Sequence, residues 1–280
     1  MKDNRLYPLM FKPILMQKVW GGDKLHLLFR KENVENLGES WEISGVEGNE
    51  SEVVNGPLAG NKLSQLIEEF KGELLGNRVY KKFGNQFPLL FKFIDAQKDL
   101  SIQVHPDDSV AIKRHDSFGK TEMWYILQAD EGARLILGFK EGITQDAYAK
   151  ALEEGSLEDK MREVPVKAGD SFYLKPGTVH AIGGGIVLAE IQQSSDVTYR
   201  IYDWNRPDTD GNLRELHTEE ARDVIDFSTS ESAQLSIPNE WNRANTLCKS
   251  PYFHTSLIKI SQPLVRNYDD LDSVSYTHLT

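Results

Sequence analysis

The run LSIQVHP, residues 100–106, decides how the rest of the sequence is interpreted. As a strand, it places Ser101, Gln103 and His105 on one face and three aliphatic side chains on the other, because side chains alternate along a strand. The polar face of a strand commonly meets solvent, which is the first interpretation. The second interpretation turns this polar face into a barrel or cleft, the inverse of the usual pattern. Two segments further along the chain favour the second.

Both segments carry ligand-type side chains at the ends of predicted strands. The run GKTEMWY, residues 119–125, begins a strand in which Lys120 and Glu122 share a face. A strand at 170–174 then leads through a Pro-Gly turn to His180, an arrangement that holds one imidazole rigidly.

His105, Glu122 and His180 therefore form a set of two histidines and one carboxylate on separate strands, with Gln103 as a possible fourth donor. Neutral imidazoles and a carboxylate suit Zn²⁺ or Fe²⁺. A single histidine is more often an ordinary hydrogen-bonded residue than a ligand. Three such groups in these settings favour a metal site.

Arg200 is the other chemically informative residue, because it interrupts an aromatic and apolar strand predicted at 198–203. A guanidinium group in such a strand is costly without a carboxylate or phosphate partner. One possibility is an internal ion pair with Glu190 or Asp203, and the other is a bound anion. Arg206, which precedes a proline, is a solvated loop charge unless it lines a site.

Short β-rich runs broken by Gly, Pro, Asn and Asp dominate the chain, which favours a β-barrel or sandwich with helical insertions. Helices are expected at 107–114, at 62–83 with a break at Gly72, and at 144–161 with Thr144 as the cap. Gly183-Gly184-Gly185 is expected to form a hairpin turn. The polar stretch 228–245 is the predicted linker, followed by a small β unit over 252–265. The predicted strands are 41–45, 89–94, 100–104, 123–127, 133–139, 170–174, 186–192 and 198–203.

Composition limits the class of protein. The 280 residues contain 32 Lys+Arg and 43 Asp+Glu, a formal charge of −11, which argues against nucleic acid or an anionic membrane surface as partner. Cys248 is the only cysteine, so an intrachain disulfide is excluded and a reducing compartment is favoured. The N-terminal run has no signal-peptide core, and no segment approaches the ~20 apolar residues of a membrane span. These features predict a cytoplasmic location.

These motifs together resemble the class I mannose-6-phosphate isomerases, zinc enzymes of the cupin superfamily, and in particular their short bacterial branch. The resemblance runs from PLMFKPILMQKVWGG at 8–22 and GESWEISG at 38–45 to about residue 227. Its most specific runs are 100–107, 119–127, 177–183 and 196–204. The paired histidines of the general cupin pattern are here Gln103 and His105, and its carboxylate is delayed to Glu122.

The resemblance implies a mainly β fold, a cupin (jelly-roll-like) β-barrel with helical insertions plus a partial C-terminal β unit. It implies a catalytic domain over 1–230, then a linker and an incomplete C-terminal β domain over 231–280. Residues 271–280 look unlike the family. We expect them to be non-native, as in a truncated or chimeric gene model.

The resemblance also implies one zinc ion per chain and the interconversion of mannose 6-phosphate and fructose 6-phosphate, a small phosphorylated hexose, through an enediol. By position, the zinc ligands correspond to Gln103, His105, Glu122 and His180, and the family's active-site arginine corresponds to Arg200. Because an arginine does not readily lose its proton, Arg200 is assigned to stabilising the enediolate.

The remaining family residues around the sugar phosphate are Lys120, Glu190, Ser101 and Arg206. Lys120 and Glu190 are rival proton-transferring groups. Phosphate binding is assigned to Arg206 and Ser101, with Lys120 as a possible contributor.

Two alternatives remain open. A metal-dependent cupin oxygenase or decarboxylase would favour three histidines and a glutamate, so Gln103 counts against it. A non-catalytic sugar-phosphate-binding cupin would be expected to lose metal ligands or Arg200, and this chain retains them.

Overall fold

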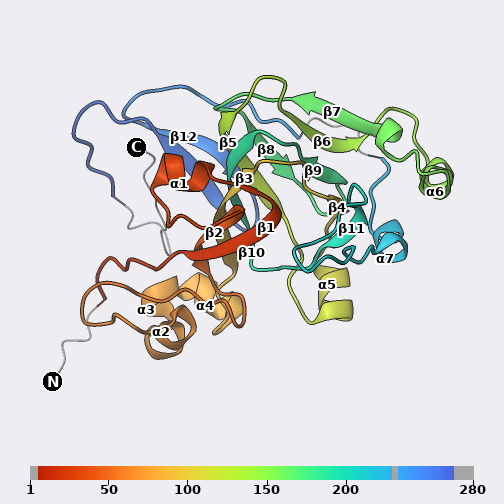
Figure 1. Ribbon diagram of the computed structural model, residues 1–280. Helices are drawn as coiled ribbons and strands as arrows, with labels where there is room; N and C mark the ends of the chain where they lie inside the picture. Colours follow the sequence, from red (N-terminus) through yellow and green to blue (C-terminus); the bar gives the residue numbers. More distant parts are fainter. Residues whose placement is uncertain (1–5, 229–232, 268–280) are drawn as a thin grey trace.

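The computed structural model describes residues 6–228 and 233–267. All but two of its strands form two antiparallel sheets that lie face to face (Figure 1). The six-stranded sheet has the order β1 (Ile14–Gly22), β2 (Leu37–Ser44), β3 (Leu89–Ala96), β10 (Ile186–Gln193), β5 (Glu122–Ala129) and β8 (Ser171–Leu174). The five-stranded sheet has the order β11 (Tyr199–Tyr202), β4 (Ile102–Val104), β9 (His180–Ile182), β6 (Arg134–Phe139) and β7 (Met161–Pro165). The predicted mainly β, jelly-roll-like fold is confirmed, although the described strands form an open sandwich and not one closed barrel.

Aliphatic side chains fill the space between the sheets. Ile94 and Leu188 from the six-stranded sheet pack in one cluster with Leu135 and Leu137 from the five-stranded sheet, and all four are buried. Burial of each such side chain stabilises the fold by roughly 1.5–3 kcal/mol.

Helices cover the outer faces of the sheets. The helices α6 (Gln145–Glu153) and α7 (Thr218–Arg222) pack on the five-stranded sheet, and α1 (Lys24–Phe29) packs on the six-stranded one. The helices α2 (Leu63–Phe70), α3 (Gly72–Leu75) and α4 (Asn77–Phe83) form a group beneath β1 and β2 in Figure 1. α5 (Asp108–His115) follows β4, and a 3-10 turn (Glu158–Lys160) precedes β7. Among the described residues, no helix combines the length and apolar composition needed to cross a membrane.

Every strand predicted from the sequence overlaps an observed strand, including the strand that begins at His180, whereas β1, β7, α1 and α7 were not predicted. The helix expected over 62–83 is divided into three, because Lys71 and Gly76 adopt positive φ angles of 51° and 81°. The helix expected over 144–161 ends at Glu153, shortly before Gly155 with φ of 66°. Thr144 caps this helix as predicted, because its hydroxyl accepts the Ala147 N–H at 3.2 Å.

The hairpin expected at Gly183-Gly184-Gly185 is wrong. The strand before it, β9, pairs with β4 and β6, whereas the strand after it, β10, pairs with β3 and β5. The three glycines thus carry the chain from one sheet to the other. They are needed for close approach, since a Cβ on Gly183 would lie 2.2 Å from the main-chain oxygen of Arg134.

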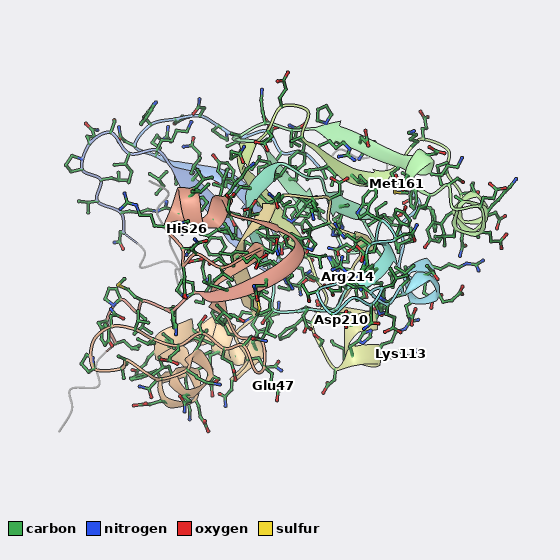
Figure 2. The ribbon with its side chains drawn as sticks, in the orientation of Figure 1. His26, Glu47, Lys113, Met161, Asp210 and Arg214 are labelled. Carbon is green, nitrogen blue, oxygen red and sulfur yellow. The ribbon has the colours of Figure 1, made fainter. Side chains whose placement is uncertain are left out.

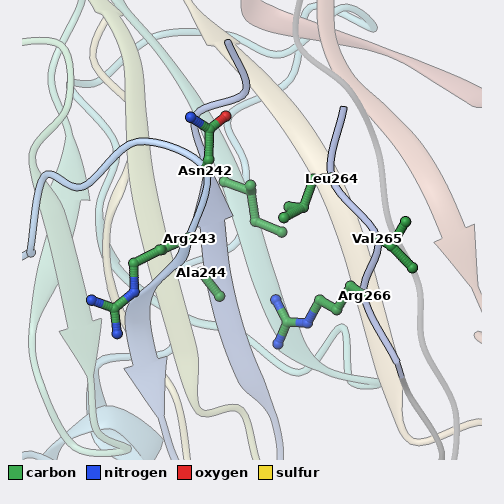
Figure 3. A pocket seen from close by; sticks show the side chains of 7 residues that line it. Asn242, Arg243, Ala244, Leu264, Val265 and Arg266 are labelled. Atoms are coloured by element: carbon green, nitrogen blue, oxygen red, sulfur yellow. The ribbon is translucent and has the colours of Figure 1, made fainter. Parts of the chain in front are cut away.

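The C-terminal ribbon, β12 (Ala244–Lys249) and β13 (His254–Ile258), packs on the outer face of the six-stranded sheet. The predicted linker is partly held in place, because the Leu235 N–H donates to the main-chain oxygen of Ser171 at 2.8 Å. The predicted domain boundary after residue 230 and the residues 271–280 lie outside the described residues, so both stay predictions. A surface hollow of about 310 Å³ beside β12 is lined by Asn242–Ala244, Ile258 and Leu264–Arg266 (Figure 3). It contains none of the residues predicted to carry chemistry.

Candidate metal and catalytic site

Strand β4 has the inverted pattern, with its polar side chains inside. Ser101 and His105 are 3% and 2% exposed, while Ile102 and Val104 are fully buried in the cluster beneath α6 and α7. Gln103 pairs with Arg200 of β11 on one side and with His180 of β9 on the other. One cross-strand row therefore carries three of the residues that the sequence singled out.

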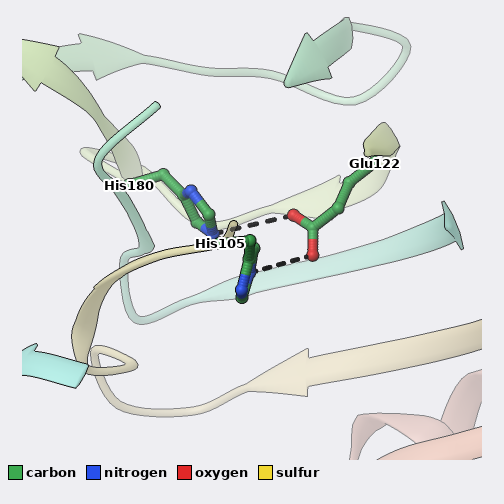
Figure 4. Close-up of side chains that lie close together, drawn as sticks. All are labelled: His105, Glu122 and His180. Carbon is green, nitrogen blue, oxygen red and sulfur yellow. Dashed lines mark ion pairs between the residues drawn. The ribbon is translucent and has the colours of Figure 1, made fainter. Parts of the chain in front are cut away.

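His105, Glu122 and His180 converge from three strand ends (Figure 4). Their ligand-type atoms all lie within 4.8 Å of one another, and all three side chains are buried. His105 Nε2 is 3.2 Å from Glu122 Oε1, and His180 Nε2 is 3.6 Å from Glu122 Oε2. The Nδ1 atoms face the carbonyl oxygens of Val197, at 3.0 Å, and Thr178, at 2.8 Å. Because a carbonyl only accepts, each ring carries its proton on Nδ1 and directs the Nε2 lone pair toward the carboxylate.

The electrostatics keep both rings neutral and the carboxylate charged. Burial, reinforced by Lys120, lowers the pKa of His105 to about 3, and burial lowers the pKa of His180. Burial opposes ionisation of Glu122 as well, but the Lys120 ammonium outweighs it and holds the pKa of Glu122 well below its ordinary value. These are the protonation states that a metal requires of its ligands.

Two lone pairs and a carboxylate face one point, and the Lys120 ammonium lies against one side of them, 3.1 Å from Glu122 Oε1. Among the described residues, neither carboxylate oxygen of Glu122 accepts a hydrogen bond, although both are buried. A buried, unsatisfied carboxylate is costly unless a positive charge faces it. The two nitrogens and the oxygen match the donors that Zn²⁺ takes in proteins, so these residues fit the predicted ion.

Three other predicted residues surround the donor atoms. Lys120 Nζ lies 3.1 Å from Glu122 Oε1 and 3.3 Å from His105 Nε2. The Gln103 amide nitrogen lies 3.4 Å from His180 Nε2, so the side chain reaches the donor set. The Ser101 hydroxyl donates to Gln103 Oε1 at 3.4 Å. Ser101 thus contacts the Gln103 amide directly.

A buried ionic network that the sequence did not predict adjoins this centre. Lys92 Nζ on β3 is 3.0 Å from Glu190 Oε1 and 3.9 Å from Glu39 Oε2. Trp124 Nε1 donates to Glu190 at 2.7 Å. Burial and Glu122 raise the pKa of Glu190, whereas Lys92 counteracts them. The sequence did contain a sign that Lys92 is unusual. It interrupts the apolar run LLFKFI, just as Arg200 interrupts its own strand.

Replacing Lys92 with methionine should lower the free energy of unfolding by about 3–5 kcal/mol at pH 8, because two buried carboxylates lose their counter-charge. The loss should be smaller at pH 5. Without Lys92 the pKa of Glu190 rises further, and a carboxyl with a raised folded-state pKa is relieved as falling pH protonates it. Denaturant unfolding at both pH values measures the effect. The exposed Lys81→Met is the matched control and should change stability little. An equal loss in both variants would contradict the prediction.

Two arginines bind Asp203 just after β11, and Arg200 lies close to them. Arg214 donates to Asp203 twice at 2.6 Å, and Arg206 donates once at 3.1 Å. Arg214 lies close to β11 (Figure 2). Arg200 forms neither internal pair considered from the sequence, because Glu190 pairs with Lys92 and Asp203 with the other two arginines. Its guanidinium instead donates from Nη1 to the main-chain oxygen of Glu215 at 2.9 Å. Arg214 was not predicted, since nothing in the sequence separates it from a solvated loop charge.

Comparisons with known proteins point to one family. Residues 9–132 match the model of the phosphomannose isomerase type I catalytic domain. The mannose-6-phosphate isomerase of Streptococcus mutans is 40% identical over 250 residues, which cover 88% of this chain and 77% of that protein. ManA of Bacillus subtilis, also a mannose-6-phosphate isomerase, is 41% identical over 223 residues, 78% of this chain and 68% of that protein.

Solved structures agree with the sequence matches. The crystal structure of the mannose 6-phosphate isomerase from Bacillus subtilis superposes with a TM-score of 0.82 at 34% identity, covering 89% of this chain and 79% of that one. A zinc-bound mannose 6-phosphate isomerase superposes with a TM-score of 0.65 at 15% identity, covering 86% and 80%. This more distant match supports the fold alone.

Proposed function

This chain belongs to the type I phosphomannose isomerase family, and on that premise we propose a zinc site and residue roles for the interconversion of mannose 6-phosphate and fructose 6-phosphate. The observation that supports the zinc site best is the convergence of two neutral imidazole nitrogens on a buried carboxylate that accepts no hydrogen bond among the described residues. His105, Glu122 and His180 would hold one zinc ion per chain, with the Gln103 amide as fourth ligand. When bound, zinc polarises and orients sugar oxygens.

The reaction moves a proton between two adjacent sugar carbons and needs a group to transfer it. Lys120 is better placed than Glu190, because its Nζ faces the donor atoms directly while both Glu190 oxygens are engaged by Trp124 and Lys92. Glu190 remains the rival, since burial raises its pKa toward the range useful for proton transfer. Arg200 keeps its proton and would stabilise the enediolate oxygen.

The substrate phosphate would bind at the arginines beside Asp203. Three guanidinium groups gather at this corner, although the whole chain carries −11. Asp203, Asp208 and Asp99 offset part of their charge. Arg206 is the proposed phosphate ligand, because a single bond at 3.1 Å holds it and its buried Nε has no partner among the described residues. Ser101, the second predicted ligand, precedes β4, contacts Gln103 and would contribute from the same side as that amide.

Purified protein should contain about one zinc ion per chain and form fructose 6-phosphate from mannose 6-phosphate. Metal analysis measures the zinc content, and a coupled enzyme assay measures the formation of fructose 6-phosphate. Removal of zinc with a chelator should abolish turnover, and added zinc should restore it. Full turnover by metal-free protein would refute the zinc site, whereas zinc-loaded protein inactive on both sugars would refute the residue roles.

A further inference from the structure

Arg200 sits on an edge strand, so its main chain has a partner strand on one side only. Strand β11 is the last strand of the five-stranded sheet and pairs with β4 alone. Its pairing is also irregular, since a register shift separates Arg200 from Tyr202. An edge strand leaves main-chain N–H and C=O groups unpaired, and a bulge in it changes the direction of a side chain. The direction of the guanidinium therefore depends on what contacts the free edge.

Residues Glu215 to His217 close that edge with three hydrogen bonds to Arg200. The His217 N–H donates to the Arg200 main-chain oxygen at 2.7 Å, and the Arg200 N–H donates to His217 Nδ1 at 3.3 Å. The guanidinium donates to the Glu215 main-chain oxygen at 2.9 Å. The imidazole and the main-chain N–H of His217 thus take the place of a partner strand at Arg200.

His217 is itself fixed. It immediately precedes α7, whose Ala221 is fully buried in the same cluster as Ile201 of β11. To accept from Arg200, its ring must keep the lone pair on Nδ1 and carry the proton on Nε2, which faces the Glu215 carboxylate at 4.0 Å. The Tyr199 ring lies beside the His217 ring, and the two ring centroids are 6.3 Å apart.

We propose that His217 is a positioning residue for Arg200, holding its main chain at the sheet edge so that the guanidinium faces the reacting sugar. The inference rests on the proposed role of Arg200 in catalysis. The sequence spacing hides it, because 17 residues separate the two positions.

The test compares two amides at position 217. His217→Asn places an acceptor near the position of Nδ1, whereas the longer His217→Gln places its amide nearer Nε2. Asn should keep kcat within about threefold of wild type, while Gln and His217→Leu should lower kcat roughly 10–100-fold, as small displacements of a catalytic group do. KM and zinc content should stay near wild-type values, because the metal ligands are untouched. Equal kcat values for the Asn and Gln variants would overturn the proposal. This comparison does not need the Leu variant, so it holds even if that variant fails to fold.

A double-mutant cycle separates positioning from an independent effect. In an Arg200→Ala background, His217→Gln should change the residual kcat by less than about twofold, because the residue that it orients is gone. The same loss in both backgrounds would overturn the proposal. Failure of the proposed function would appear as an inactive wild-type protein, whereas failure of this inference would appear as an active one whose turnover ignores position 217.

Discussion

Alanine in place of His180 should remove both the bound zinc and nearly all isomerase turnover. The ring supplies one of two neutral imidazole nitrogens in the buried donor set, and alanine leaves Glu122 facing a single ring. A bound metal contributes several kcal/mol of transition-state stabilisation, and each 1.4 kcal/mol corresponds to a tenfold change in rate. We therefore expect kcat to fall roughly 10³-fold or more. Metal analysis and the coupled assay, run on the same preparation, measure the two losses together.

His254→Ala is the matched control, because it deletes an exposed imidazole from strand β13. It should retain both zinc and activity. Full metal occupancy in the His180→Ala protein would show that the imidazole is not a ligand. The expected pattern is the joint loss of metal and turnover in one variant only.

Arg200→Ala should produce the opposite pattern, with turnover lost and zinc retained. Arg200 lies in the same cross-strand row as Gln103 and His180 but contributes no donor atom to the metal. Deleting one group that stabilises developing negative charge costs roughly 10²–10³-fold in kcat. Steady-state kinetics should show that fall with zinc near the wild-type level.

Two further variants bracket this result. Arg200→Lys keeps the charge but not the planar fork, so it should recover only part of the lost turnover. Arg243→Ala, which removes an exposed guanidinium beside β12, should behave as wild type. Normal turnover by Arg200→Ala would exclude Arg200 from the mechanism, and with it the positioning role of His217.

Local signals in the sequence were sufficient for much of the fold and of the site. Alternation along 100–106 identified the inward polar face of β4, and the Pro-Gly turn before His180 indicated a fixed imidazole. Family resemblance assigned the same residues, and the structure brings His105, Glu122 and His180 together. The ligand roles themselves stay predictions until metal is measured.

The residues that were missed depend on contacts between distant segments. Lys92 acquires its meaning only when β10 brings Glu190 beside it, and His217 only when the chain returns to the edge of β11. The wrong hairpin at Gly183 has the same origin, because a glycine run does not reveal which sheet receives the next strand. The choice of partner strand depends on the whole chain, so it cannot be inferred from a local sequence pattern.

Strand β4 also limits how this protein can evolve. Its two faces serve different purposes, since Ile102 and Val104 pack in the outer core while Gln103 faces the proposed reaction centre. A substitution on one face of β4 leaves the side chains of the other face unchanged. An insertion or deletion of one residue would exchange the faces, because a slip of one position reverses every side chain. Descendants of this gene can therefore vary this strand by replacement, while changes in length must fall in the loops on either side.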